Sequence, residues 1–144
     1  MLSNGKLKIK QLIEDAMIPT YNHDTDAGLD LYSCEDTLVA PGERRAVGTG
    51  ISVALPRGHV GLVWDRSGLA LKQGLTTFGG VIDEGYRGEI KVILYNTTSQ
   101  YVEIKKHDRI AQLLLQRVEK PKIEIVNYLA DSDRGEKGFG SSGK

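Results

Sequence analysis

Residues 46–64 read AVGTGISVALPRGHVGLVW and contain two short apolar or mixed runs, 46–55 and 60–64. The triplet Pro56-Arg57-Gly58 separates these runs, and proline and glycine this close together mark a turn. Runs of this length that are bounded by turn residues are typical of β-strands. The segment therefore predicts two strands joined by a turn.

The same organisation extends toward both ends of the chain. Charged and aliphatic residues alternate in 6–10, 102–105 and 123–125, which is the period of a half-buried strand. Further short runs occupy 29–34, 37–40, 90–95 and 110–118, with turn signals at Pro41-Gly42, Gly79-Gly80 and Gly85. Regular short strands with turns between them predict an all-β domain, a distorted jelly-roll-like barrel or sandwich.

One short helix is expected within this β pattern, over residues 67–74. Ser67 is a suitable N-cap and Gly74 a suitable C-terminal stop. Arg66 precedes the segment, and the N-terminus of a helix offers amide groups and a positive dipole to an anion. The alternative is a simple one-turn connector between strands.

Composition restricts the class of protein. The chain has 144 residues, enough for one domain with its own core, and Lys+Arg equals Asp+Glu at 19 each. This balance argues against a protein that coats nucleic acid or a membrane surface. No apolar run approaches the roughly 18 residues that a membrane span needs. Cys34 is the single cysteine, so an intrachain disulfide is excluded, and we expect a cytoplasmic protein without nucleic-acid or membrane partners.

The three histidines are possible metal ligands, and the single tryptophan is a possible core residue. His23, His59 and His107 lie far apart without a second ligand at metal-binding spacing, so no zinc site is predicted. Trp64 ends an apolar run and is expected to pack in the core.

Residues 80–89, GVIDEGYRGE, hold the main candidate for catalysis and are expected to form a hairpin between strands. Asp83 follows Val81 and Ile82, so its carboxylate is expected at the edge of a partly dry pocket, where it can act as a general base toward water. Tyr86 follows three residues later and can form a wall of that pocket. The alternative is that Asp83 is an ordinary turn-forming aspartate.

Two polar residues stand inside apolar strand patterns. Asp30 lies in the run 29–34, where an uncompensated charge is costly, so it needs a hydrogen-bond partner or serves a metal-bound ligand. Gln112 lies among aliphatic residues of 110–118, and its amide needs a partner, for which a backbone contact is the commoner outcome.

The C-terminal residues 134–144, RGEKGFGSSGK, have too little apolar surface to fold alone. They have what is needed to close over a phosphorylated base. Glycines allow a close backbone approach, Arg134 and the serines can hold phosphate oxygens, and Phe139 can stack on a base. The alternative is a frayed, solvated tail.

These segments, in this order, resemble the motifs of the trimeric dUTPase family (deoxyuridine triphosphate nucleotidohydrolases). The resemblance covers nearly the whole chain, with matching segments at 27–31, 65–70, 80–89, 108–114 and 134–143. Three residues depart from the usual motifs: His107 and Lys137 where glycine is common, and Ser142 where threonine is common. Residues 75–80 also lack the asparagine that reads uracil in many bacterial members.

The resemblance implies a jelly-roll-like β-domain over residues 1–129 and a flexible glycine-rich arm over 130–144 that closes over the active site. It implies a homotrimer whose active sites are shared between subunits, and the Mg²⁺-dependent hydrolysis of dUTP to dUMP and pyrophosphate. That reaction keeps uracil out of DNA and supplies dUMP for thymidylate synthesis.

The resemblance also assigns roles to individual residues. Asp83 matches the acid that activates the attacking water, and Tyr86 matches the ring beneath the deoxyribose that excludes a 2′-hydroxyl. Asp30 matches the acid that reaches the metal through water. The implied substrate contacts, apart from Tyr86, are Arg66, Ser67, Gly68, Thr77, Gly80, Val81, Ile82, Lys91, Gln112, Arg134, Phe139, Gly140 and Ser141.

Two alternatives share the expected fold. One is a dCTP deaminase or a bifunctional deaminase–dUTPase, which release of ammonia from dCTP would reveal. The other is a non-catalytic jelly-roll binding or regulatory module, or a phage-type dUTPase with an added regulatory protein-binding role, and pyrophosphate release from dUTP with Mg²⁺ would separate catalysis from binding alone. The segment around Asp83 and the tail with Phe139 favour the simple dUTPase.

Overall fold

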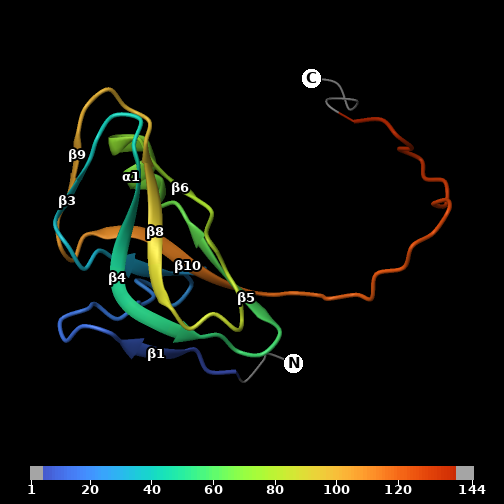
Figure 1. The fold of residues 1–144 in the computed structure, drawn as a ribbon, viewed down its shortest axis with the longest axis horizontal. Coiled ribbons are helices and arrows are strands. Elements are labelled where there is room, and N and C mark those ends of the chain that lie inside the picture. The colour runs from blue at the N-terminus through green and yellow to red at the C-terminus, as the bar shows by residue number, and fades with distance from the viewer. Residues whose placement is uncertain (1–4, 139–144) are drawn as a thin grey trace.

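The computed structural model describes residues 5–138, which form two four-stranded sheets, a two-stranded ribbon and a short helix (Figure 1). The elements are β1 (Lys8–Gln11), β2 (Gly28–Tyr32), β3 (Thr37–Val39), β4 (Arg44–Ala54), β5 (His59–Trp64), α1 (Ser67–Gln73), β6 (Leu75–Phe78), β7 (Val81–Ile82), β8 (Glu89–Asn96), β9 (Val102–Ile104) and β10 (Arg109–Arg117).

Each sheet combines strands that are distant in sequence. One sheet has the order β1-β4-β8-β6, the other has the order β2-β10-β5-β7, and β3 pairs with β9 in the ribbon. The pairings between these strands are antiparallel. This arrangement confirms the expected all-β, jelly-roll-like fold.

The core consists of aliphatic side chains contributed by both sheets. Leu31 and Leu113 from one sheet and Ile51 and Ile90 from the other are almost completely buried. Each such side chain contributes roughly 1.5–3 kcal/mol when it leaves water. The expected strands 46–55 and 60–64 are confirmed as β4 and β5, because one face of each supplies this core.

The expected strand at 123–125 is wrong. The chain after β10 runs away from the sheets in an extended path (Figure 1), and Ile123 and Ile125 are 95% and 96% exposed. Alternation of residue types gives a strand only where a neighbouring strand supplies hydrogen-bond partners, and this segment has none within the described residues.

The expected hairpin at 80–89 is also wrong, because its two ends belong to different sheets. β7 pairs with β5, whereas β8 pairs with β4 and β6. The turn itself is local, since the Tyr86 N–H donates to the Asp83 carbonyl at 3.0 Å. Residues 83–88 therefore form a loop that crosses between the sheets, here called the crossing loop.

Trp64 is not in the core, contrary to expectation. Its neighbour Val63 is 7% exposed and Trp64 is 57% exposed, because successive side chains of β5 face opposite sides of the sheet. No helix among residues 5–138 is long and apolar enough to cross a membrane.

Candidate functional site

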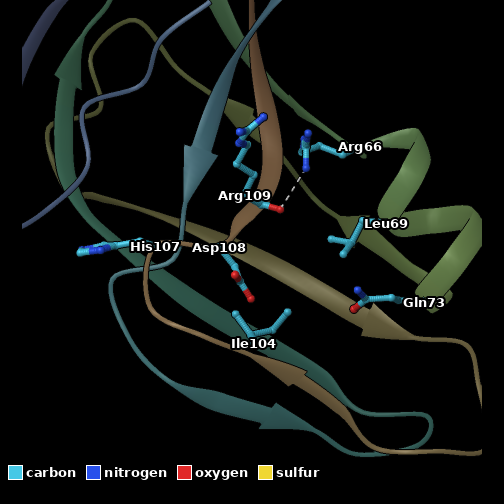
Figure 2. A pocket seen from close by; sticks show the side chains of 7 residues that line it. All are labelled: Arg66, Leu69, Gln73, Ile104, His107, Asp108 and Arg109. Atoms are coloured by element: carbon cyan, nitrogen blue, oxygen red, sulfur yellow. Dashed lines mark hydrogen bonds between the residues drawn. The ribbon is translucent and has the colours of Figure 1, made fainter. Parts of the chain in front are cut away.

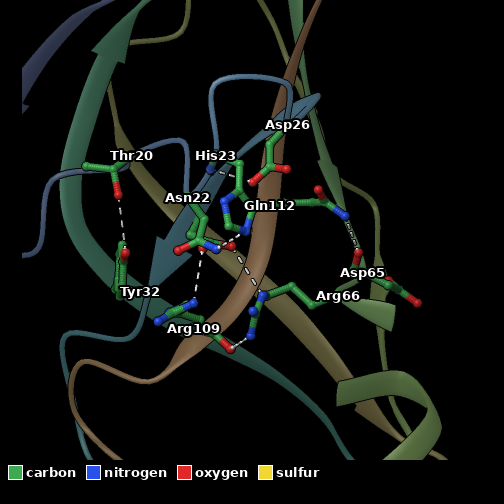
Figure 3. A network of polar contacts seen from close by, with 10 residues as sticks. Thr20, Asn22, His23, Asp26, Tyr32, Asp65, Arg66, Arg109 and Gln112 are labelled. Atoms are coloured by element: carbon green, nitrogen blue, oxygen red, sulfur yellow. Dashed lines mark hydrogen bonds and ion pairs between the residues drawn. The ribbon is translucent and has the colours of Figure 1, made fainter. Parts of the chain in front are cut away.

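A polar cavity of about 250 Å³ lies between the start of α1, β2 and β10. Its lining includes five residues singled out from the sequence: Asp30, Arg66, Ser67, Gly68 and Gln112. Figure 3 shows Arg66, from the segment before α1, and Gln112, from β10, near this region. It also shows Asn22, His23 and Asp26, which belong to the loop before β2. We call this polar cavity the arginine cavity.

Asp30 has two cationic partners. Its Oδ1 lies 3.2 Å from Nε of Arg66, and its Oδ2 lies 3.7 Å from Nη1 of Arg109. The residue is 9% exposed, so these ion pairs offset the cost of burying its charge. The structure thus supplies the partner that the sequence required.

The same ion pairs limit how the carboxylate of Asp30 can contribute to binding a metal ion. Among the described residues, no group of three or more histidine, cysteine or acidic side chains is arranged to hold a metal ion. A single carboxylate that already contacts two guanidinium groups fits Mg²⁺ only through water and together with phosphate oxygens. The donor set is therefore compatible with the expected water-mediated role.

Gln112 makes the backbone contact that the sequence analysis favoured. Its Nε2 donates to the carbonyl of Asp65 at 2.8 Å, which connects β10 to the segment before α1. Gly28 makes room for this side chain, since a Cβ there would lie 2.6 Å from Oε1 of Gln112.

The start of α1 differs from the expectation in one detail. The helix begins at Ser67, and Arg66 is the N-cap without a side-chain capping hydrogen bond, so Ser67 as N-cap is wrong. The predicted stop is confirmed, because Gly74 adopts φ 64° and its N–H donates to Ala70. Ser67 and Gly68 are exposed and face the arginine cavity, where the first N–H groups of a helix lack intrahelical acceptors.

A second cavity, of about 350 Å³, was not predicted from the sequence and lies on the other side of Arg66 (Figure 2). Figure 2 shows Leu69 and Gln73 of α1 on one side and His107, Asp108 and Arg109 on the other. Arg66 lines both cavities, and its Nη1 donates to the Arg109 carbonyl at 3.5 Å.

His107 occupies the left-handed region with φ 69°, a conformation that glycine adopts at little cost. Its Nε2 lies 3.0 Å from the Asp15 carbonyl. This contact helps to explain why a histidine is accommodated at a turn position where the family motif has glycine.

The crossing loop lines a third cavity of about 340 Å³, here called the carboxylate cavity. Its lining combines three residues singled out for the site, Asp83, Tyr86 and Lys91, with neighbours from the adjoining strands. These neighbours are Ala46, Val81, Ile82, Glu89 and Ile93. The walls are largely apolar, as expected. Asp83 itself is exposed in the single chain.

Tyr86 is fixed by a hydrogen bond within the crossing loop. Its hydroxyl donates to the Glu89 carbonyl at 2.9 Å, although the residue is 44% exposed. Lys91 lies 3.8 Å from Glu89 through its Nζ, so its ammonium group remains at the rim.

Asp65 is a polar centre that the sequence analysis did not single out. Its Oδ1 accepts from the Thr77 N–H at 2.7 Å and from the Thr77 hydroxyl at 2.5 Å, and its Oδ2 accepts from the Thr76 hydroxyl at 2.7 Å. Burial raises the pKa of Asp65, but these hydrogen bonds outweigh it, and the pKa lies below its usual value of 3.8.

Asp65 and Thr77 line a fourth cavity of about 480 Å³, together with Trp64, Gly80 and Val81 among others. We call it the threonine cavity. The partners of Asp65 lie 11 and 12 residues away, which is why no short motif indicated this centre.

The expected site residues therefore fall into separate groups on one chain. Asp30, Arg66 and Gln112 line the arginine cavity, whereas Asp83 and Tyr86 line the carboxylate cavity, and none of the four cavities described above contains both groups.

Arg134 is apart from both groups. It lies in a turn of the segment after β10, where its Nε donates to the Lys137 carbonyl at 2.9 Å. Phe139, Gly140 and Ser141 lie outside the described residues.

The fold and its polar cavities define a class, a jelly-roll-like domain suited to bind a phosphorylated ligand. Comparison with known proteins then identifies the family. The dUTPase family model matches residues 14–143, and the chain belongs to this family.

Similar curated proteins are named deoxyuridine 5′-triphosphate nucleotidohydrolase. The one from Clostridium tetani is 48% identical over 140 residues, covering 96% of this chain and 97% of its own length. The one from Mycolicibacterium gilvum is 50% identical over 145 residues, covering 95% of this chain and 94% of its own length.

Solved structures agree in fold. The dUTPase of Staphylococcus bacteriophage 80alpha with dUpNHpp superposes with a TM-score of 0.92 at 33% identity, covering 96% of this chain and 99% of that chain. A point mutant of the dUTPase from phage phi11 of S. aureus, described as coordinating a structural Mg(II) ion, has a TM-score of 0.83 at 28% identity. That match covers 88% of this chain and 99% of the phage chain.

Proposed function

We propose that the chain hydrolyses dUTP to dUMP and pyrophosphate, with Asp83 holding the water that attacks the α-phosphorus. The observation that carries this proposal is the dUTPase family match over residues 14–143, which includes the crossing loop. The reaction removes a source of uracil in DNA and supplies dUMP for thymidylate synthesis. The relatives, named as nucleotidohydrolases, do not favour the deaminase alternative.

The arginine cavity is the proposed phosphate side of the site. Hydrolysis of a triphosphate depends mainly on positioning and charge neutralisation. Arg66 and Gln112 contact phosphate oxygens in this proposal, together with Ser67 and Gly68 at the start of α1. Asp30 would hold Mg²⁺ through water, and the ion would supply neutralisation of phosphate charge when bound.

The carboxylate and threonine cavities are the proposed base and sugar side. Thr77, Gly80, Val81 and Ile82 contact the uracil in this proposal. The ring of Tyr86 lies beneath the deoxyribose, and Lys91 lies at the rim of the same cavity.

A complete site needs more than one chain in this proposal. The phosphate side and Asp83 line different cavities of one chain, which supports the expected homotrimer with shared active sites. In this proposal the β-domain spans residues 1–129, although the chain leaves the sheets after β10 ends at Arg117. Residues 130–144 are the proposed arm, which closes over the ligand through Arg134, Phe139, Gly140 and Ser141. The expected setting is the cytoplasm.

The decisive experiment compares Asp83→Asn with Glu103→Gln in the full chain. Glu103 is a matched acidic control, because its side chain is 65% exposed and it lines none of the cavities described above. Pyrophosphate release from dUTP with Mg²⁺ should fall roughly 10²- to 10⁴-fold in Asp83→Asn, the usual size of a general-base effect. Binding of dUpNHpp should remain close to that of the unaltered chain.

The control should retain full turnover. Full turnover by Asp83→Asn would refute the role of Asp83. Absence of dUTP hydrolysis by the unaltered chain would refute the function itself.

A further inference from the structure

Asp65 connects three segments that the proposed function uses. Its carboxylate accepts hydrogen bonds from Thr76 and Thr77 at the start of β6. Its backbone carbonyl accepts from Gln112 of β10 at 2.8 Å, and Arg66 follows it in the chain. Three hydrogen bonds to one carboxylate fix its position closely, and bonds to a charged acceptor are stronger than neutral ones.

The two oxygens of Asp65 have different partners. Oδ1 accepts both the N–H and the hydroxyl of Thr77, whereas Oδ2 accepts the Thr76 hydroxyl. The pKa of Asp65 is lowered by these bonds, so the group is ionised near neutral pH and can only accept. The hydroxyl proton of Thr77 is therefore directed at Asp65.

This arrangement sets the polarity of the Thr77 hydroxyl toward any ligand. A hydroxyl has one proton and two acceptor lone pairs. Because the proton points at Asp65, the oxygen offers lone pairs to the threonine cavity, which Thr77 lines. The N3 position of uracil carries a proton and matches this acceptor, whereas N3 of cytosine is itself an acceptor.

The main chain next to Thr77 is also held in place. The Gly80 carbonyl accepts from the Val63 N–H at 2.8 Å, and a Cβ on Gly80 would lie 2.7 Å from the Val63 carbonyl oxygen. Asp65 at one end and Val63 at the other thus fix the turn between β6 and β7. A ligand meets an acceptor whose direction is determined before binding, which reduces the ordering cost of recognition.

We propose that Asp65 is a positioning residue for base selection, which fixes the Thr77 hydroxyl as an acceptor for the N3–H of uracil and thereby disfavours cytosine. The proposal rests on the proposed function, because it deepens the recognition of the base at the same site. It gives the chain a side-chain contact for uracil in a loop that lacks asparagine.

The test measures kcat/KM for dUTP and for dCTP in the full chain with Mg²⁺, by pyrophosphate release. In Asp65→Ala, the acceptor of the Thr77 N–H and of the Thr77 hydroxyl is removed, so the hydroxyl proton is no longer directed away from the ligand. Selectivity for dUTP over dCTP should fall about tenfold or more, mainly through KM for dUTP, because an unmatched buried polar group is the main cost of a wrong ligand.

Thr76→Val is the matched control. It removes the hydroxyl bonded to Oδ2 and leaves both contacts of Thr77 with Oδ1 in place. Its selectivity should equal that of the unaltered chain, whereas Thr77→Val should lose selectivity and Thr77→Ser should keep it. The double variant of Asp65→Ala and Thr77→Val should lose no more selectivity than Thr77→Val alone.

Several results would overturn the proposal. One is unchanged selectivity in Asp65→Ala or Thr77→Val, and another is an equal loss in Thr76→Val, which indicates a merely structural role. If Asp65→Ala does not fold, the comparison of Thr77→Val with Thr77→Ser still decides. If the unaltered chain releases no pyrophosphate from dUTP, the proposed function fails instead, so the two failures are distinguishable.

Discussion

Gly88 lies against the ring of Tyr86, and this contact gives a direct test of the proposal that Tyr86 excludes ribonucleotides. A Cβ at position 88 would overlap the Tyr86 hydroxyl oxygen and would lie 2.6 Å from Cζ of Tyr86, compared with 3.4 Å for an ordinary contact. In Gly88→Ala the ring must therefore move by at least about 0.8 Å, the difference of these two distances. The ring can yield, because Tyr86 is 44% exposed.

The expected cost to stability is modest. The movement breaks the hydrogen bond from the Tyr86 hydroxyl to Glu89, and relief of the overlap is partial, so we expect a loss of about 1–2 kcal/mol in the free energy of unfolding. The expected effect on selectivity is larger. A ring that is moved from its proposed position beneath the deoxyribose no longer fits that sugar closely, so the preference for dUTP over UTP should fall about tenfold or more.

The assay compares kcat/KM for dUTP and UTP in Gly88→Ala and Gly85→Ala. Gly85 is a matched control in the same loop, because a Cβ there would meet nothing within 4 Å. Gly85→Ala should keep the preference of the unaltered chain. An unchanged preference in Gly88→Ala, with dUTP hydrolysis intact, would refute the argument that the Tyr86 ring excludes ribose.

Two further predictions concern stability. Asn96 is completely buried and makes four hydrogen bonds, to Val39, to Gln100 and twice to Thr98, so Asn96→Ala should lower the free energy of unfolding by about 2–4 kcal/mol. Urea denaturation measures this loss, and a change below about 0.5 kcal/mol would contradict it. The lowered pKa of Asp65 means that its contribution to stability is fully present above its unfolded pKa near 3.8 and is lost as the pH falls through the lower folded value. The stability difference between the unaltered chain and Asp65→Asn should therefore shrink below about pH 4, and a difference that grows there would contradict the assignment.

Local pattern predicted the strands that short apolar or mixed runs form between turn residues. In β4 and β5 the length of each run indicated a strand, and the turn at 56–58 follows from proline and glycine. The pairing of strands that are distant in the sequence could not be predicted from local pattern. Ile123 and Ile125 alternate with charged residues as a strand does, but no described neighbour pairs with them, and the crossing loop joins two sheets because β7 pairs with the distant β5.

The sequence predicted those parts of the site in which a buried polar side chain needs a hydrogen-bond or ionic partner. The sequence required a partner for Asp30 and for Gln112, and the structure supplies arginines for one and a backbone carbonyl for the other. Which partner is chosen depends on how β2, β10 and the start of α1 meet in space. Asp65 escaped notice for the same reason, since its hydrogen-bond donors come from a strand beyond the helix.

The helix α1 has no fully buried side chain, although Leu69 packs at the edge of the core. Substitutions along its outer face, such as at Leu71, which is 87% exposed, should therefore leave folding nearly unaffected. The outer face of α1, the helix that presents Ser67 and Gly68, can thus change in evolution with little loss of stability of the domain. Affinity for the ligand and stability of the domain can then change independently in this protein.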